Sequence, residues 1–302
     1  AGAGRPRRDG RRAVHPDPEP GGSRCRDAAP VSSHQLRRDT MTARRVDVAF
    51  TALEADDERV EGRVAVVIDV LRATSTMVTA LWNGADRIVP VAEAEQALQE
   101  ATALREAGRE ERNGAAGKVE MEGKSGRILT CGERDGYQLE GFDLGNSPLA
   151  CTRERVDGRT LVMTTTNGTF ALARTRNARK VYIGSFLNAS AVADQLIQSD
   201  LDILLVCSGW KGRFCMEDTL LAGHLLERLQ EQDPSEAGWT DSAKLAVAYY
   251  KSKRNAITES ILDSDHARRL RHLARDEEIR YCCHADQCPC APSFEDGAVR
   301  LS

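Results

Sequence analysis

The chain has 302 residues, of which 41% are hydrophobic and 29% are charged, and its formal net charge is -4. This composition is typical of a soluble globular protein, and the charge balance argues against a nucleic-acid partner. No apolar run is long enough to cross a bilayer. The central cysteines follow no regular spacing, so we expect reduced thiols in a cytoplasmic protein.

The first forty residues differ from the rest, because they are rich in Arg, Pro and Gly and have almost no apolar side chains. Such a segment cannot bury enough surface to fold, and it lacks the apolar stretch of a secretory signal. We therefore expect a disordered, non-native tail over 1–40, a natural start at Met41 and a single domain over 41–302. A basic arm that binds nucleic acid is the less favoured alternative.

The stretch VAVVIDVLRATST, residues 64–76, joins a strand to a helix. Its first five residues are apolar and mostly β-branched, which predicts a buried parallel strand. Asp69 and Arg72 follow, and then Thr74 and Ser75 stand where an apolar helix begins. Ligands bind open α/β sheets at such turns, and a helix N-terminus suits a phosphate. The alternative, with equal weight, is that the aspartate ends a strand and a hydroxyl caps the helix.

Apolar runs and amphipathic segments alternate along the rest of the chain, which predicts a parallel sheet with right-handed crossovers. The fold class expected is three-layer α/β/α with a mostly parallel sheet. Whether the domain has two lobes is left open. Gly108–Gly126 is predicted to be a loop. Strands are predicted at 45–51, 87–91, 128–131, 161–163, 180–184 and 201–206, and helices at 92–107, 170–174, 190–198, 219–229, 243–253 and 259–275.

Further polar groups follow two of these strands. In LVMTTTNGT, Thr165, Thr166, Asn167 and Gly168 precede a helix, and three adjacent threonines exceed what one cap needs. Hydroxyls and backbone N–H groups together can hold an oxyanion there. In CGERDG, Glu133 and Arg134 are expected at the tip of a strand. The turn FDLGNSP adds Asp143 and Asn146, although this pattern alone is more often an Asx-type turn.

The strand at 201–206 leads into the segment CSGWKGR and then to Glu217 and Asp218 at a helix start. These acids could complement the helix dipole or bind a metal across the sheet from Asp69. Cys207 and Arg213 have the spacing of cysteine-dependent phosphatases, but no hydroxyl follows the arginine. Near the C-terminus, the spacing CCxxxxCxC matches no standard zinc motif, so structural zinc is the less favoured interpretation there.

Six segments carry a family resemblance: IDVLRATST, CGERDG, GFDLGNSP, TTTNGT, GSFLN and CSGWKGRFCMED, in this order. Over about Val46–Leu301 the chain resembles the 2-phosphosulfolactate phosphatase family. The resemblance implies a magnesium-dependent hydrolase that removes the phosphate from position 2 of a three-carbon acid. The first candidate is 2-phospho-3-sulfolactate, which yields 3-sulfolactate and phosphate in coenzyme M biosynthesis. The cysteine-rich end departs from the usual final strand of this family.

Each candidate residue is expected in one of three roles, because Mg²⁺ takes oxygen ligands and arginine suits oxyanions. The nucleophile is left open between a metal-activated water, Asp69 and Cys207. A non-catalytic protein that binds a phospho-ligand is the second functional class. The partner expected is a small phospho-acid, with no nucleic acid or membrane, and a homo-oligomer is left open. The expected roles are catalytic for Asp69, Arg72, Glu133 and Cys207; substrate or phosphate binding for Thr74, Ser75, Arg134, Asn146, Thr165, Thr166, Asn167, Gly168, Lys211 and Arg213; and Mg²⁺ binding for Asp69, Asp143, Glu217 and Asp218, with Asp69 and Asp218 first.

Overall fold

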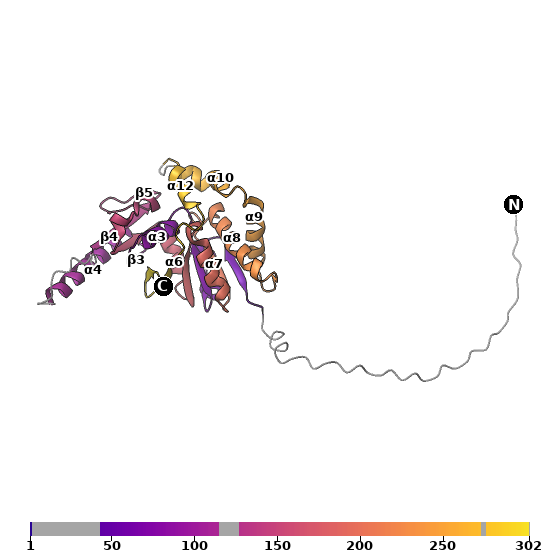
Figure 1. The fold of residues 1–302 in the computed structure, drawn as a ribbon, viewed down its shortest axis with the longest axis horizontal. Helices are drawn as coiled ribbons and strands as arrows, with labels where there is room; N and C mark the ends of the chain where they lie inside the picture. The colour runs from indigo at the N-terminus through magenta and orange to yellow at the C-terminus, as the bar shows by residue number, and fades with distance from the viewer. Residues whose placement is uncertain (2–42, 115–126, 273–275, 302) are drawn as a thin grey trace, which may run out of the picture. The chain divides into compact units, whose positions relative to one another are not determined.

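The computed structural model describes residues 43–114, 127–272 and 276–301, together with Ala1. Its strands form a ten-stranded sheet in the order β1-β8-β2-β7-β9-β10-β3-β6-β4-β5 (Figure 1). The strands are β1 Val46–Ala49, β2 Val64–Ile68, β3 Arg87–Pro90, β4 Arg127–Arg134, β5 Tyr137–Gln138, β6 Arg159–Thr164, β7 Lys180–Gly184, β8 Ile203–Cys207, β9 Ser293–Glu295 and β10 Ala298–Arg300.

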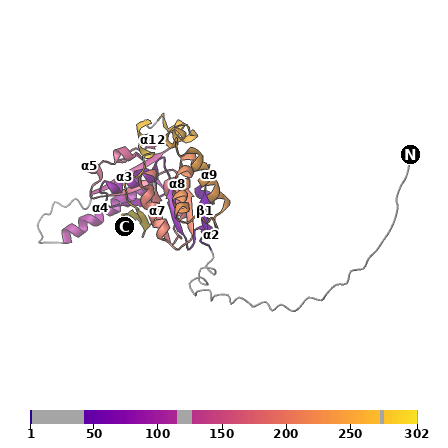
Figure 2. The same cartoon turned by 45° about the vertical axis from the view of Figure 1, so that its right-hand side comes forward.

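Helices cover this sheet, and α10 and α12 lie together over one end of it (Figure 1). Figure 2 shows that α4 projects away from the rest. Within the described ranges, no helix has both the length and the apolar character needed to span a membrane. The helices are α2 Asp57–Val60, α3 Ala73–Trp82, α4 Ala94–Gly114, α5 Arg153–Val156, α6 Gly168–Arg174, α7 Ala189–Gln198, α8 Met216–Gln232, α9 Asp241–Lys253, α10 Ile257–Leu262, α11 Asp265–Leu270 and α12 Asp276–Cys282.

The sheet consists of two parallel blocks. Strands β1, β8, β2 and β7 pair in parallel, and so do β3, β6 and β4. The hairpin β9–β10 joins the blocks through antiparallel pairings on both of its sides. The predicted mostly parallel sheet is therefore confirmed. However, β2 and β3, which are consecutive in the chain, lie in different blocks.

Each face of the sheet carries its own hydrophobic core, because successive strand residues point to opposite faces. Val64, Val66 and Ile68 of β2 pack into one core with apolar residues of α7, α8 and α9. Ala65 and Val67 pack into the other core with residues of α3 and α6. Helices on both faces give the three-layer architecture that the sequence predicts.

Two predicted segments differ from the structure. The helix predicted at 259–275 is broken into α10 and α11, because the Ser264 side chain accepts a hydrogen bond from the N–H of Ala267 and caps a new helix. Residues 273–275 lie outside the described residues. The loop predicted at 108–126 is helical over its first part, since α4 continues to Gly114, and residues 115–126 are not described. The tail predicted over 1–40 is likewise outside the described part, Ala1 excepted.

The C-terminal hairpin was not predicted, although a local signal for it exists. Asp296 and Gly297 both have positive φ angles, 50° and 76°, and join Glu295 to its cross-strand partner Ala298. Asp-Gly is a preferred pair for this two-residue turn. The hairpin is essential to the architecture, because it is the connection between the two blocks.

The close packing of α8 on α9 generates a stability prediction. A Cβ at Gly223 would lie 2.6 Å from the Cβ of Tyr250 and would also overlap backbone atoms of Ala246. Gly223→Ala should therefore lower the free energy of unfolding by about 1–3 kcal/mol through overpacking. Urea unfolding followed by circular dichroism measures this change.

Gly108→Ala is the matched control, because Gly108 lies within α4 and a Cβ there would meet nothing within 4 Å. This variant should gain about 0.5–1 kcal/mol from helix propensity. Equal effects of the two substitutions would contradict the packing of α8 against α9 described here.

Candidate active site

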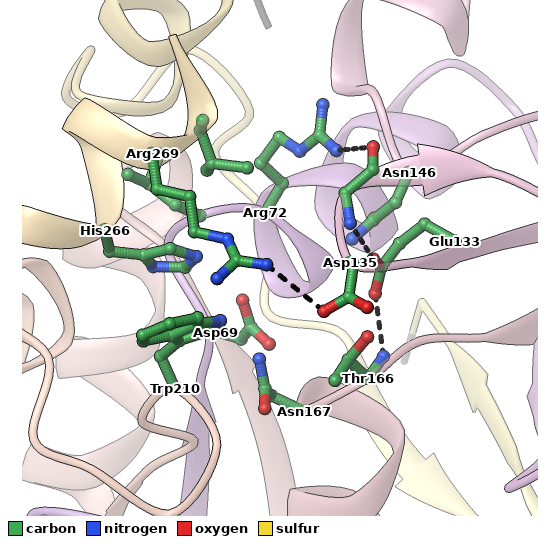
Figure 3. Close-up of a pocket in the computed structure, with 13 residues that line it drawn as sticks. Asp69, Arg72, Glu133, Asp135, Asn146, Thr166, Asn167, Trp210, His266 and Arg269 are labelled. Carbon is green, nitrogen blue, oxygen red and sulfur yellow. Dashed lines mark hydrogen bonds and ion pairs between the residues drawn. The ribbon is translucent and has the colours of Figure 1, made fainter. Parts of the chain in front are cut away.

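One pocket collects polar side chains from segments far apart in the sequence (Figure 3). These segments are the turn after β2, the β4–β5 hairpin, the loop after β5, the loop after β6, the loop after β8 and helix α11. Three carboxylates, two arginines and a histidine are among its lining residues, so it is strongly polar. The lining residues are Asp69, Leu71, Arg72, Glu133, Asp135, Gly136, Asn146, Thr166, Asn167, Trp210, His266, Arg269 and Leu270.

Asp69 lies at the carboxyl end of β2 and is only 5% exposed. Its Oδ1 accepts a hydrogen bond of 3.1 Å from the N–H of Ala73, in the first turn of α3. Burial raises the pKa of Asp69 to about 6, and the nearby Glu133 adds to this, whereas Ala73 and the charge of His266 oppose it. A carboxyl group that changes charge near neutral pH in a pocket is a candidate functional group.

Gly168 allows the two blocks of the sheet to meet at this carboxylate. It begins α6, directly after the loop that follows β6, whereas Asp69 follows β2 in the other block. A Cβ at Gly168 would lie 2.9 Å from Oδ2 of Asp69 and would overlap the Cβ of Ala73. The glycine predicted for phosphate binding is therefore needed for close approach of the two segments.

Glu133 connects the hairpin to the loop after β6. As predicted, Glu133 and Arg134 lie at the tip of a strand, since they are the last two residues of β4 before the turn at Asp135 and Gly136. Oε1 of Glu133 accepts a 2.7 Å hydrogen bond from the N–H of Thr166, and Oε2 accepts one of 2.7 Å from the N–H of Gly136. This buried carboxylate holds two walls of the pocket together.

Arg72 is buried, and an acid from the far end of the chain neutralises it. Its Nη1 lies 3.1 Å from both carboxylate oxygens of Glu278 in α12, and its Nη2 donates to the carbonyl of Gly136 at 3.0 Å. These contacts use the guanidinium to position α12 and the hairpin, so Arg72, which was predicted to be catalytic, lines the pocket with its charge already paired. Glu278 was not predicted, because nothing in its local sequence distinguishes it from a surface acid.

His266 of α11 was also missed, and it changes the role of a predicted metal ligand. Its Nδ1 lies 2.6 Å from Oε1 of Glu217, and its ring stacks on Trp210 at 6.0 Å between centroids. Burial would lower the pKa of His266, but the hydrogen bond and charge of Glu217 outweigh this and raise it. Burial would raise the pKa of Glu217, and His266 lowers it instead. Glu217 thus orients a histidine that lines the pocket.

Asp218 is buried behind the pocket and does not line it. Its oxygens accept hydrogen bonds from the N–H groups of Val70 at 2.9 Å and Gly209 at 3.1 Å, and from the hydroxyl of Ser208 at 3.2 Å. Burial, with Glu217 and Asp69 nearby, raises its pKa well above the usual range. Asp218, which was predicted with Asp69 as a first choice for metal binding, therefore connects the turns after β2 and β8.

Cys207 and Arg213 do not form a phosphatase loop. Cys207 is fully buried at the end of β8, and burial raises the pKa of its thiol well above the ordinary value, so a thiolate is disfavoured. Between them the chain makes a tight turn in which Trp210 and Arg213 exchange backbone hydrogen bonds of 2.9 and 3.0 Å. The geometry corrects the prediction that these two residues act together on a phosphate.

Arg134 and Asp143 point to other partners. Nη2 of Arg134 donates to the carbonyl of Ala92 and the hydroxyl of Thr164. Oδ2 of Asp143 accepts hydrogen bonds from the N–H and hydroxyl of Thr130. Neither residue lines the pocket, so the structure does not support their predicted substrate and metal roles.

The predicted uncharged polar residues divide into two groups. Thr74 and Ser75 bond to backbone groups of Asp69 and Val70, and the hydroxyl of Thr165 accepts from the N–H of Thr169. The predicted alternative that Thr74 or Ser75 caps the helix is wrong, because both lie within α3 and its N-cap position is Arg72. The second group lines the pocket and consists of Thr166, Asn146 and Asn167. Thr166 Oγ1 and Asn146 Oδ1 are buried and have no hydrogen-bond partner among the described residues. These oxygens are free to bind a ligand.

The cysteine-rich C-terminus provides no support for zinc. Cys282, Cys283 and Cys288 are buried free thiols, and Cys290 is partly buried. In the part of the chain that is described, they form no cluster with metal-binding spacing. Burial raises the pKa of each of these thiols, which favours the neutral packed form.

A buried carboxylate with a raised pKa, an oriented histidine and free oxygen ligands at strand ends define an enzyme-like site for a small anionic molecule. Comparison with known proteins agrees with this class. The family model described as 2-phosphosulpholactate phosphatase matches residues 50–297. The chain therefore belongs to the 2-phosphosulfolactate phosphatase family, which makes it a phosphoric monoester hydrolase.

Individual relatives cover most of both chains. A protein of Thermotoga petrophila is 42% identical over 242 residues, which is 80% of this chain and 93% of the relative. A protein of Clostridium perfringens is 36% identical over 256 residues, 85% of this chain and 96% of the relative. One of Clostridium acetobutylicum is 34% identical over 255 residues, with 84% and 99% covered. Each of the three is named a probable 2-phosphosulfolactate phosphatase.

The raised pKa of Asp69 generates a stability prediction. Because its pKa rises from 3.8 to about 6, the ionised carboxylate opposes folding above pH 6. Asp69→Asn should therefore raise the free energy of unfolding in EDTA at pH 8, by roughly 1–3 kcal/mol. This gain should disappear as the pH falls through 6 toward 4, because the wild-type carboxyl group then becomes neutral. Urea unfolding across this pH range measures both effects.

Asp263→Asn is the control. This aspartate is exposed, and its hydrogen bond to Arg268 lowers its pKa, so its stabilising contribution is present above pH 4 and is lost only at lower pH. The substitution should slightly destabilise the protein, equally at pH 6 and pH 8. A protein with Asp69→Asn that is less stable than wild type at pH 8 would contradict the assigned burial cost.

Proposed function

We propose that the chain is a magnesium-dependent phosphatase that converts 2-phospho-3-sulfolactate to 3-sulfolactate and phosphate. The observation that carries the proposal is the buried carboxylate of Asp69, which lines one pocket together with Asn146 and Thr166, whose side-chain oxygens have no partner among the described residues. The names of the relatives support the choice of substrate. The free thiols of the described cysteines support the cytoplasm as the compartment.

The donor set of the pocket fits Mg²⁺, which binds a few carboxylate or carbonyl oxygens and keeps several waters. Asp69, Asn146 and Thr166 would hold the ion, since the last two have buried oxygen atoms without partners. When bound, Mg²⁺ neutralises charge on the phosphate oxygens. Oε1 of Glu217 holds His266 and Asp218 holds the two turns, so we assign both acids to positioning. Oε2 of Glu217 is also buried without a partner among the described residues, and Glu217 forms a second group of possible metal ligands with Cys215 and His266.

The residues of the chain itself bind and orient the ester. Asn167 lines the pocket, and its Oδ1 accepts from the N–H of Lys211 at 3.2 Å, so its amide N–H₂ is left for a phosphate oxygen. Among the described residues, only Nδ1 of His266 has hydrogen-bonding partners, which are Glu217 and the thiol of Cys215. The other nitrogen is available to donate a proton to the oxygen of the leaving group. Either Asp69 or a positioned water attacks phosphorus.

Phosphate release from 2-phospho-3-sulfolactate tests the proposal directly. Activity should vanish with EDTA and return with Mg²⁺, and Asp69→Asn should lower kcat at least about 1,000-fold by removing charge where the metal and phosphate meet. Cys207→Ser should keep most of the activity, because this thiol is buried and does not line the pocket. Activity that survives EDTA but is lost with Cys207→Ser would overturn the metal-dependent mechanism.

The role of His266 predicts a dependence on the leaving group. His266→Gln should lower kcat for an alkyl phosphate by about 100-fold or more, as expected for a lost general acid. The loss should be much smaller for p-nitrophenyl phosphate, whose leaving group needs no proton. His284→Gln, at an exposed position, is the control. Equal losses on both esters would assign His266 to structure rather than to proton transfer.

A further inference from the structure

Three segments meet at the rim of the pocket through a single carboxylate oxygen. Oδ1 of Asp135, in the β4–β5 turn, lies 2.6 Å from Nζ of Lys211 and 3.3 Å from Nη2 of Arg269 in α11. In Figure 3, Arg269 extends across Trp210 toward Asp135. Arg269 and Asp135 line the pocket, and Lys211 directly follows the lining residue Trp210. The Asp135 side chain therefore bridges two cations beside the pocket.

The two cations keep their positions independently of Asp135. The guanidinium of Arg269 lies 4.6 Å from the ring centroid of Trp210, and Nζ of Lys211 lies 5.7 Å from the same centroid. Such cation–π contacts hold a charge over an aromatic face. The backbone of Lys211 is also fixed, because its N–H donates to Asn167. A binding site for an anion is thus already formed.

The Asp135 carboxylate, in contrast, is replaceable. Its side chain is 53% exposed, and the side chains of Lys211 and Arg269 are 46% and 42% exposed. Exposed ion pairs contribute little to stability, so another anion can compete for the same cations. The turn itself stays anchored, because the backbone of Gly136 bonds to Glu133 and Arg72. The side chain can therefore leave while the hairpin remains in place.

We propose that Lys211 and Arg269 form the subsite for the acid group that the substrate carries beside its phosphate ester, and that Asp135 occupies this subsite until the substrate displaces it. The inference rests on the proposed function, which assigns the phosphate to Asp69 and its neighbours. The shared ligand chemistry is an oxyanion, either carboxylate or sulfonate. An ester without such a group leaves the cations paired with Asp135 and gains nothing from the subsite.

Three phosphate esters show which acid group the subsite binds. Phenyl phosphate has no acid group, 2-phospholactate has a carboxylate, and 2-phosphoethanesulfonate has a sulfonate. Lys211→Met and Arg269→Met should each lower kcat/KM for one or both acid esters by about 10- to 100-fold, as for a lost charge-assisted hydrogen bond. The kcat/KM for phenyl phosphate should change less than about 3-fold, because this ester has no acid group to contact either cation. Equal losses on all three esters would overturn the subsite.

Two further variants sharpen the test. Asp135→Asn should lower KM for the acid esters by about 3- to 10-fold, because it removes the competing anion of an exposed pair. Arg268→Met is the matched control on the same helix, since Arg268 pairs with Asp263 and Asp265 rather than with Asp135. An unchanged or raised KM with Asp135→Asn would overturn the displacement of Asp135.

A binding measurement separates this inference from the proposed function. With Trp82 and Trp239 replaced by Phe, the fluorescence of Trp210 reports on the subsite without turnover. Titration with 3-sulfolactate should change the signal, and Arg269→Met should abolish the response. If this holds but no ester is hydrolysed, the subsite stands and the proposed reaction fails. Hydrolysis of the acid esters with unaltered kinetics in Arg269→Met would overturn the subsite alone.

Discussion

The rest of the site depends on keeping the Asp69 carboxylate buried where the two blocks of the sheet meet. Burying a charge is costly unless hydrogen bonds or opposite charges compensate for it. Here the compensation is partial. The N–H of Ala73 and the charge of His266 lower the pKa of Asp69, but burial still raises it to about 6. Gly168 brings the second block against this carboxylate. Because burial destabilises the ionised carboxylate of Asp69, a bound cation would stabilise it.

Four other buried acids in the described structure have different partners, although Oε2 of Glu217 is buried without one. Asp218 accepts two backbone N–H bonds and a hydroxyl, and Glu133 accepts two backbone N–H bonds. Glu217 has His266, and Glu278 has Arg72. Each of these connections joins segments that are remote in sequence or fixes a turn. The acids around the site therefore hold its frame in place, which leaves Asp69 the least compensated carboxylate that lines the pocket.

Local sequence was sufficient for those features that depend on neighbouring residues. The bounds of β2 and β7 were predicted at Val64–Ile68 and Lys180–Gly184, because short β-branched runs identify buried strands. Asp69 was found because it directly follows such a strand. Residue type alone does not separate a helix cap from a phosphate ligand, and Thr74 is neither a cap nor a lining residue of the pocket, because its hydroxyl bonds to the backbone of Asp69.

The features that were missed depend on long-range packing. His266 and Arg269 were included in one long charged helix, and only the break at Ser264 and the docking of α11 bring them to the pocket. The partner of Arg72 is 206 positions away, so its sequence neighbours could not reveal that its charge is already neutralised. Trp210 was read as part of a possible cysteine-phosphatase loop, whereas its ring supports the rim cations.

The balance of charges in the pocket favours a bound metal ion. Arg72 is paired with Glu278, His266 with Glu217, and both Lys211 and Arg269 with the single carboxylate of Asp135. Displacing Asp135 would free these last two cations for the acid group of the substrate. The phosphate, next to Asp69 and Glu133, would still face negative charge without an unpaired cation from the lining residues. A divalent ion held by Asp69 would reverse that local charge, which is the electrostatic reason for expecting magnesium where the carboxylate is least compensated.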